Sequence, residues 1–195
     1  MAKPRLLARS EYALIGNIIG KSFASDPVNQ WVFGGEQAIS AYFRAVAKKL
    51  YLKSGYGHVM SDGTGGTLWL PPQAPKDIPL WNSLDMAASL IWHSGMRSIN
   101  RGIALDHYLG ARMPTQPHYY LYAIGADPAC QGMGIGGQLM AAGLEQADKE
   151  AMPAYLESTK ESNVSFYRRF GFEVTALAEP PSGCPPLWLM WREPQ

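Results

Sequence analysis

The segment Gln131–Gly137 is the part of the sequence whose residue types and spacing most clearly suit chemistry. It contains four glycines, Gly132, Gly134, Gly136 and Gly137. Glycine lets the backbone adopt positive φ and approach a ligand closely. A strand is predicted before the segment, over 119–126, and a helical pattern follows from Gln138. A helix that begins here would present free N–H groups and the positive end of its dipole, which together bind phosphate groups. The segment therefore predicts a site for a phosphorylated cofactor, and hence an enzyme.

The same glycines formally fit the pattern of a dinucleotide-binding fold. Gly132, Gly134 and Gly137 match G-x-G-x-x-G, and Glu157 lies 20 residues beyond Gly137. A doubly wound fold needs several further βα units, but only 38 residues follow Glu157. Those residues are patterned as strand, loop and strand, which indicates a meander rather than a parallel crossover. The sequence therefore argues against a nicotinamide dinucleotide and keeps it only as a rival hypothesis.

A second pattern begins one residue earlier. Gln131-x-x-Gly134-x-Gly136 follows Asp127-Pro128 and precedes a helix. It resembles the acyl-CoA-binding signature of the GNAT superfamily of N-acetyltransferases, in which the rule is Q/R-x-x-G-x-G/A.

Further segments carry the same resemblance. Residues 163–172 are similar to the asparagine, tyrosine and glycine–phenylalanine stretch of this superfamily, although the step from Asn163 to Tyr167 is shorter than in many members. Together with 67–72 and 117–121, they resemble the branch that includes puromycin-acetyltransferase-like proteins.

The resemblance implies an α/β (α+β) fold, with a mixed, mostly antiparallel sheet flanked by helices on both faces. It predicts a single N-acetyltransferase domain over residues 1–195, with a helical insertion at about 77–113. It also implies acetyl-CoA as cofactor and transfer of its acetyl group to a primary amine, by direct attack in a ternary complex.

Cofactor binding is expected to use main-chain groups. By the resemblance, the strand before the turn would separate from its neighbour near residues 124–126, and its backbone would bond the pantetheine arm like an added strand. The N–H groups of the turn would cradle the pyrophosphate. We expect Met133 and Ile135 to pack inward. The residues predicted to bind the cofactor are Ile124, Gly125, Ala126, Gln131, Gly132, Met133, Gly134, Ile135, Gly136, Gly137 and Asn163.

Acetyl transfer also needs an acid and a base. Its place in the motif predicts that Tyr167 protonates the departing thiolate, since a phenol with an ordinary pKa near 10 suits that task. Glu157, at the end of a predicted strand, is the candidate base that deprotonates the amine, directly or through water. His118 is an alternative base and a candidate substrate contact, because its pKa suits neutral pH. Asp26 would contact a cationic substrate or, alternatively, form a turn before Pro27.

These residues require a framework of strands and helices. Helical patterns are predicted from Ser10 to Phe23, from Glu36 to Lys53, on both sides of Gly95 within 77–113, after Gly137, and over 163–170. Strands are predicted over 56–61, 67–70, 119–126, 154–158, 172–178 and 187–192. Asp26-Pro27 is interpreted as the stop of the first helix.

Composition excludes several other classes of protein. The net charge is +1 and no Lys/Arg block occurs, which argues against nucleic acid as a partner. No apolar run approaches the roughly 18 residues of a membrane span, and the N-terminus lacks a signal-peptide pattern. Cys130 and Cys184 form neither a disulfide framework nor a zinc pattern, so no metal and a cytoplasmic location are expected.

The acceptor is less well defined. An aromatic, weakly charged composition favours a small-molecule amine, whereas a protein N-terminus or lysine and a non-catalytic acyl-CoA sensor stay open as alternatives. The oligomeric state is also open, with a homodimer as one option.

Overall fold

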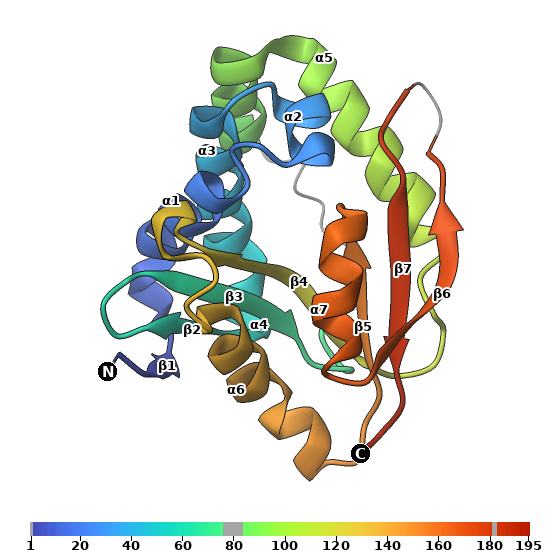
Figure 1. Ribbon diagram of the computed structural model, residues 1–195. Helices are drawn as coiled ribbons and strands as arrows, with labels where there is room; N and C mark the ends of the chain where they lie inside the picture. Colours follow the sequence, from blue (N-terminus) through green and yellow to red (C-terminus); the bar gives the residue numbers. More distant parts are fainter. Residues whose placement is uncertain (1, 76–83, 181–182) are drawn as a thin grey trace.

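A computed structural model describes residues 2–75, 84–180 and 183–195 (Figure 1). Within them the chain forms one seven-stranded sheet in the order β1-β2-β3-β4-β5-β7-β6. Among the described strands, β4 and β5 run parallel and every other neighbouring pair is antiparallel. The expected mixed, mostly antiparallel sheet is therefore confirmed, and a doubly wound parallel sheet is excluded.

The strands match the predicted ones closely, with β1 as an addition. Their bounds are β1 Pro4–Leu6, β2 Tyr56–Met60, β3 Gly65–Leu70, β4 Tyr119–Ala126, β5 Ala154–Ser158, β6 Phe172–Ala178 and β7 Leu187–Arg192. The helices are α1 Tyr12–Ser22, α2 Pro27–Phe33, α3 Glu36–Val46, α4 Leu52–Ser54, α5 Leu84–Gly110, α6 Ile135–Lys149 and α7 Val164–Arg168. A π-helical turn, Ala47–Tyr51, joins α3 to α4.

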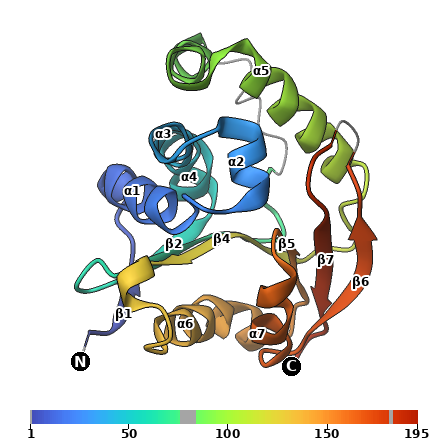
Figure 2. The same ribbon diagram turned by 45° about the horizontal axis from the view of Figure 1, so that its top comes forward.

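Helices cover both faces of the sheet. Figure 2 shows α1, α2 and α3 on one face and α6 and α7 on the other. Successive residues of a strand point to opposite faces, so Leu68 and Leu70 join the core beneath α1 and α3, while Trp69 joins the core beneath α6. No helix of the described residues combines the length and apolar character that crossing a membrane requires.

Two differences from the sequence prediction concern helix starts. Asp26-Pro27 begins helix α2 instead of only ending the preceding helix. The Asp26 carboxylate accepts a hydrogen bond from the Asn29 N–H as N-cap, and Pro27 occupies the first turn, where its missing N–H costs nothing. Helix α6 begins at Ile135, three residues before the predicted start, so Gly136 and Gly137 belong to its first turn.

The predicted helical insertion falls partly outside the described residues, since 77–83 are not among them. From Leu84 to Gly110 the chain is helical, with a break at Gly95, where φ is 76° and ψ is 175°. This break lies where the sequence suggested a change of helix.

The sheet opens between its two parallel strands. β4 pairs with β5 from Tyr119 to Leu121, and no pairing beyond Leu121 occurs among the described residues. On its other edge, β4 stays paired with β3 as far as Ala126, with a register shift that leaves Tyr122 as an extra residue. A bulge of this kind bends a strand and increases its twist. The structure thus shows the separation of β4 from its neighbour that the sequence predicted near residues 124–126.

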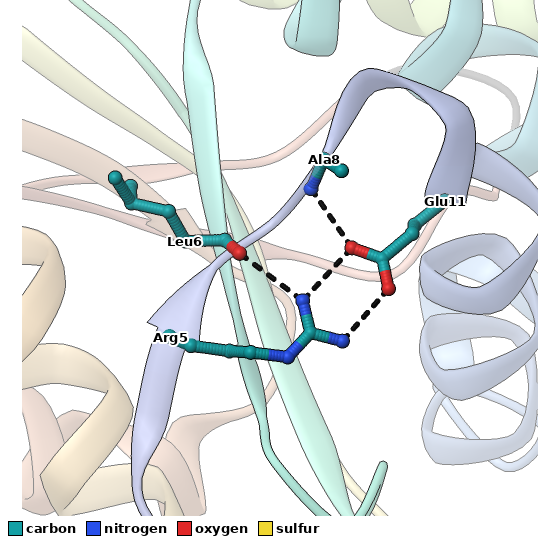
Figure 3. A network of polar contacts seen from close by, with 4 residues as sticks. All are labelled: Arg5, Leu6, Ala8 and Glu11. Carbon is teal, nitrogen blue, oxygen red and sulfur yellow. Dashed lines mark hydrogen bonds and ion pairs between the residues drawn. The ribbon is translucent and has the colours of Figure 1, made fainter.

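A polar network fixes the first strand to the first helix (Figure 3). Arg5 donates from Nη1 and Nη2 to the two carboxylate oxygens of Glu11, over 2.9 and 2.7 Å. The Ala8 N–H donates to the same carboxylate. The Arg5 guanidinium, followed by the Ala8 N–H, holds the pKa of Glu11 at about 2. The connection to α1 therefore keeps its ion pair across the physiological pH range.

A close contact between α1 and α3 gives a test of the packing. A Cβ at Gly16 would lie 2.6 Å from the backbone nitrogen of Arg44, so Gly16→Ala should force the two helices apart. We expect a loss of about 1–3 kcal/mol in the free energy of unfolding, measured by denaturant titration. Gly110→Ala is the control, because nothing lies within 4 Å of its added methyl group. Equal stability of Gly16→Ala and wild type would contradict this packing.

Candidate active site

A cavity of about 1330 Å³ lies where β4 separates from β5. Its lining comes from the ends of both strands, from α2, α3 and α5 on one face of the sheet, and from the first turn of α6 and from α7 on the other. The opening of the sheet therefore connects the two faces of the molecule at a single place.

The glycine turn forms one side of this cavity. Gly132 and Gly134 have φ of 81° and 79°, a conformation that glycine adopts without strain. The first hydrogen bond of α6 runs from the Gln138 N–H to the Gly134 carbonyl. The N–H groups from Ile135 to Gly137 precede it and have no acceptor within the helix. Free N–H groups of this kind can bind an anion, so the predicted pyrophosphate site stays a prediction that this geometry allows.

Most of the predicted site residues line the cavity. They are Asp26, Ile124, Gly125, Ala126, Gln131, Gly132, Gly134, Ile135, Gly136, Gly137, Glu157, Asn163 and Tyr167. These residues are up to 141 positions apart in the sequence, from Asp26 to Tyr167. The fold thus places both predicted proton-transfer residues and the glycine turn around one space.

Met133 is a correction. Ile135 is buried as expected, but the side chain of Met133 is 70% exposed and does not line the cavity. The residues on both sides of Met133 have positive φ. They turn the chain so that Met133 lies at the outer edge of the turn. The expected inward packing of Met133 is therefore wrong, while its main-chain contact with the cofactor stays a prediction.

His118 is a second correction, because it precedes β4 at the opposite end of the strand from the opening. Its ring is fully buried between Tyr155 and Trp191, and Nδ1 lies 2.6 Å from the Gln116 carbonyl oxygen. It does not line the cavity. The structure therefore leaves Glu157 as the candidate base.

Gly125 lines the cavity, and the packing of α1 against β4 also requires a glycine at this position. A Cβ there would lie 2.8 Å from the Cβ of Ser22, so the absence of a side chain lets α1 pack closely on β4. Lys21, on the same helix, donates to the Asp127 carboxylate over 2.7 Å. The end of α1 and the end of β4 are thus held together beside the turn.

Glu157 lies partly exposed to the cavity and accepts two phenolic hydrogen bonds. Tyr120 donates to Oε2 over 2.8 Å and Tyr155 to Oε1 over 3.2 Å. Burial raises the pKa of Glu157, the two phenols lower it, and Asp106 raises it, with a net increase above the ordinary value. A carboxylate with a raised pKa is a stronger base once it is ionised.

Tyr167 is buried beside Asp26. Burial, with a smaller contribution from the Asp26 carboxylate, raises the pKa of the Tyr167 phenol well above the ordinary value assumed from the sequence. The phenol is protonated at neutral pH, as it would be at its ordinary pKa, and the increase makes it a weaker acid than the sequence argument assumes. Asp26 is held in place by Asn29, whose side chain donates to it over 2.9 Å, and by the hydroxyl of Thr159.

A wall of tyrosines was not identified from the sequence. Tyr122 stacks on Tyr51 with ring centroids 4.3 Å apart, and its hydroxyl lies 2.6 Å from that of Tyr42. Alternation along β4 places Tyr120 on the same face as Tyr122 when the strand is regular. That signal was available in the sequence, whereas the approach of Tyr42 and Tyr51 depends on tertiary packing.

Comparison with known proteins agrees with this architecture. Residues 100–172 match the model of the Acetyltransferase (GNAT) family. Mycothiol acetyltransferases from Mycobacterium sp. strains JLS and MCS are 36% identical over 64 residues, which is 29% of this chain and 21% of each relative. The chain therefore matches about a fifth of the length of these curated relatives.

Solved structures extend the likeness to the whole fold. The structure of histone acetyltransferase HPA2 and related acetyltransferase from Corynebacterium glutamicum has a TM-score of 0.72 at 22% identity, covering 100% of this chain and 97% of that one. Arylalkylamine N-acetyltransferase 2 from Aedes aegypti has a TM-score of 0.67 at 12% identity, covering 98% of each chain. Residues 100–172 thus match the GNAT acetyltransferase model, and the whole chain shares the fold of these solved structures.

The raised pKa of Glu157 gives a test that does not require a known substrate. Because this pKa lies above the unfolded value of about 4.3, ionisation costs the folded state more than the unfolded state. Wild type should therefore lose this contribution to stability as the pH rises through the folded pKa, and Glu157→Gln should not. We expect the melting temperature of the variant minus that of wild type to increase with pH and then level off.

Differential scanning fluorimetry over a pH series measures this difference. Glu193→Gln, an exposed position after β7 outside the cavity, is the control and should show a constant difference. A constant difference for Glu157→Gln would contradict the perturbed carboxyl group.

Proposed function

We propose that this protein is an acetyl-CoA-dependent N-acetyltransferase that acts on a primary amine of a small molecule. One observation carries the proposal, namely that the glycine turn, Glu157 and Tyr167 line the same cavity at the opening of the sheet. A binding turn, a base and a protonated phenol are the three parts that acetyl transfer from a thioester to an amine needs.

Main-chain groups would hold the cofactor. The first N–H groups of α6 would bind the pyrophosphate, and the edge of β4 at Ile124 and Ala126 would bond the pantetheine arm in the manner of an added strand. Lys160 and Arg169 also line the cavity and would neutralise phosphate charge. Asn163, at the start of α7, lines the same side. Bound acetyl-CoA would supply an activated acyl group as its thioester.

Side chains would then carry out the proton transfers. Glu157 would take a proton from the ammonium group of the acceptor, leaving a neutral nitrogen that attacks the carbonyl carbon. As the new C–N bond forms and the C–S bond breaks, Tyr167 would donate its phenolic proton to the departing sulfur. Tyr120 and Tyr155 hold Glu157 in position through their hydrogen bonds and are positioning residues in this scheme. The second proton of the attacking nitrogen would leave by way of solvent and restore the Tyr167 phenol.

The cavity favours a small acceptor over a protein. Its walls opposite the glycine turn are aromatic and largely buried, with Phe33, Tyr51 and Tyr120 each less than a tenth exposed. A small amine would bury its apolar body there, which stabilises binding by about 25 cal/mol per Å². A sensor that binds acyl-CoA without turnover is the alternative, and product formation distinguishes the two.

Replacing the phenol tests the proposed acid. In Tyr167→Phe we expect kcat to fall by about 10²- to 10³-fold while KM for acetyl-CoA stays nearly constant, because the proton transfer occurs only in the transition state. The measurement is steady-state formation of N-acetyl product, detected by mass spectrometry across a panel of small amines.

Tyr56→Phe is the matched control for this substitution. The Tyr56 hydroxyl donates to the Gly143 carbonyl over 2.8 Å and does not line the cavity. Its removal should cost about 1 kcal/mol of stability and leave kcat unchanged. An unchanged kcat in Tyr167→Phe would refute the acid role.

The glycine turn predicts a specific loss of cofactor affinity. Gly134→Glu would place a bulky negative side chain at the start of α6, so we expect acetyl-CoA affinity to fall by more than about 100-fold. Gly134 has positive φ, and any side chain there adds strain. Gly134→Asn is therefore the control, since asparagine tolerates this conformation, and it should retain most of the affinity. Unchanged affinity in a folded Gly134→Glu protein would remove the turn from the cofactor site.

A further inference from the structure

Two local irregularities of the backbone meet at one pair of aromatic rings. Tyr51 is the last residue of the π-helical turn, and Tyr122 is the extra residue of the bulge in β4. Both kinds of irregularity interrupt regular hydrogen bonding and are frequent at functional sites, where a bulge redirects a side chain. The rings of Tyr51 and Tyr122 stack with centroids 4.3 Å apart and an interplanar angle of 15°. The π-helical turn and the bulge therefore contribute to the same contact.

This pair of rings lies at the opening of the sheet. β4 pairs with β5 as far as Leu121, so Tyr122 is the first residue of β4 beyond that pairing. Tyr51 and Tyr122 both line the cavity. Tyr51 is 1% exposed, whereas Tyr122 is partly exposed. The surface that the pair offers to the cavity is therefore mainly that of Tyr122.

The Tyr122 ring is held in one orientation. Its hydroxyl lies 2.6 Å from the Tyr42 hydroxyl, and Tyr51 covers one of its faces. Phe43 packs beside it, with ring centroids 5.8 Å apart. A ring that is already fixed loses little freedom when a ligand packs on it, so the entropy cost of binding is small. Tyr122 thus forms a flat surface that is ordered before any ligand binds.

The Tyr122 surface lies one ring away from the candidate base. The Tyr120 ring lies edge-on to that of Tyr122, with centroids 6.0 Å apart, and the Tyr120 hydroxyl donates to Glu157 over 2.8 Å. A group bound on Tyr122 would therefore need only a short arm to bring an amino group to Glu157. Aromatic rings in stacked or edge-to-face contact stabilise each other beyond the area that they bury. The arrangement favours an acceptor with a flat, conjugated body over a puckered aliphatic one.

We infer that Tyr122 is a specificity-determining residue that binds the flat body of an aromatic primary amine and selects it over an aliphatic amine of the same size. The inference rests on the proposed function and names the class of its acceptor. Tyr42 and Tyr51 act through Tyr122, because they fix its ring, and are positioning residues. The three tyrosines take no part in proton transfer.

Phenethylamine and cyclohexylethylamine test this inference, because they share a terminal aminoethyl arm and differ in a flat against a puckered ring. The measurement is kcat/KM for acetylation of each amine by wild type, Tyr122→Leu, Tyr122→Phe and Tyr12→Leu, with product detected by mass spectrometry. The preference of each protein is the ratio of the two kcat/KM values. The amines have different pKa values, but this difference is the same for every protein and cancels when the ratios are compared. Melting temperature shows that each variant is folded, and Tyr122→Met replaces Tyr122→Leu if the latter does not fold.

Wild type should prefer phenethylamine. Tyr122→Leu should reduce that preference by about three- to tenfold, the range expected for one aromatic contact. Tyr122→Phe keeps the ring and should retain most of the preference. Tyr12→Leu is the matched control, because Tyr12 lies at the start of α1 outside the cavity, and it should leave the preference unchanged.

Three results would overturn the inference while leaving acetyl transfer intact. They are no preference in wild type, an unaltered preference in Tyr122→Leu, and an equal change in Tyr12→Leu. An equal loss in Tyr122→Phe and Tyr122→Leu would also overturn it, because the hydroxyl rather than the ring would then decide the preference. If acetyl-CoA binds but neither amine is acetylated, the acceptor class is wrong and the cofactor site stands. If acetyl-CoA does not bind, the proposed function is wrong and this inference fails with it.

Discussion

The loss of pairing between β4 and β5 is the constraint on which the site depends. The two parallel strands are bonded only from Tyr119 to Leu121 on β4 in the described chain, and the extra residue at Tyr122 turns β4 away from its partner. Paired strands lie about 4.8 Å apart and leave no room between them. Separation at this position frees the edge of β4, exposes Glu157 at the end of β5, and lets α7 bring Tyr167 alongside.

The pKa shifts of the cavity residues follow from which of their side chains stay buried at this opening. Glu157 is partly exposed to the cavity, yet burial dominates its pKa because neighbouring aromatic rings exclude water. Tyr120 and Tyr155 donate to both carboxylate oxygens, so the group keeps a fixed orientation while its pKa stays raised. Burial also raises the pKa of the Tyr167 phenol, which is protonated at neutral pH. A carboxyl group with a raised pKa and a neutral phenol lie in one cavity. This pair suits a reaction in which the carboxylate removes a proton and the phenol donates one.

Local patterns in the sequence predicted much of this, and their failures have physical causes. Alternation and helical periodicity identified the strands and most helices, and the glycine turn marked the start of α6, where an anion site is predicted. Asp26-Pro27 was interpreted only as a stop, although the same dipeptide is a strong helix start once tertiary packing supports α2. The sequence places His118 in the site by its residue type and predicts inward packing of Met133, but the direction of each side chain is set by the strand end and the turn that hold it. The pairing of Tyr42 with Tyr122 could not be predicted, because these residues are 80 positions apart and meet only through tertiary packing.

Calorimetric titration of the purified protein with acetyl-CoA, with NADH as a parallel control, tests the central claim most directly. The account predicts one acetyl-CoA bound per chain with about micromolar affinity, through the N–H groups of α6 and the free edge of β4, and no heat of binding with NADH. Binding of NADH alone would indicate that the turn serves a dinucleotide. Absence of binding by acetyl-CoA would contradict the account, and the glycine turn would then be a structural start to α6.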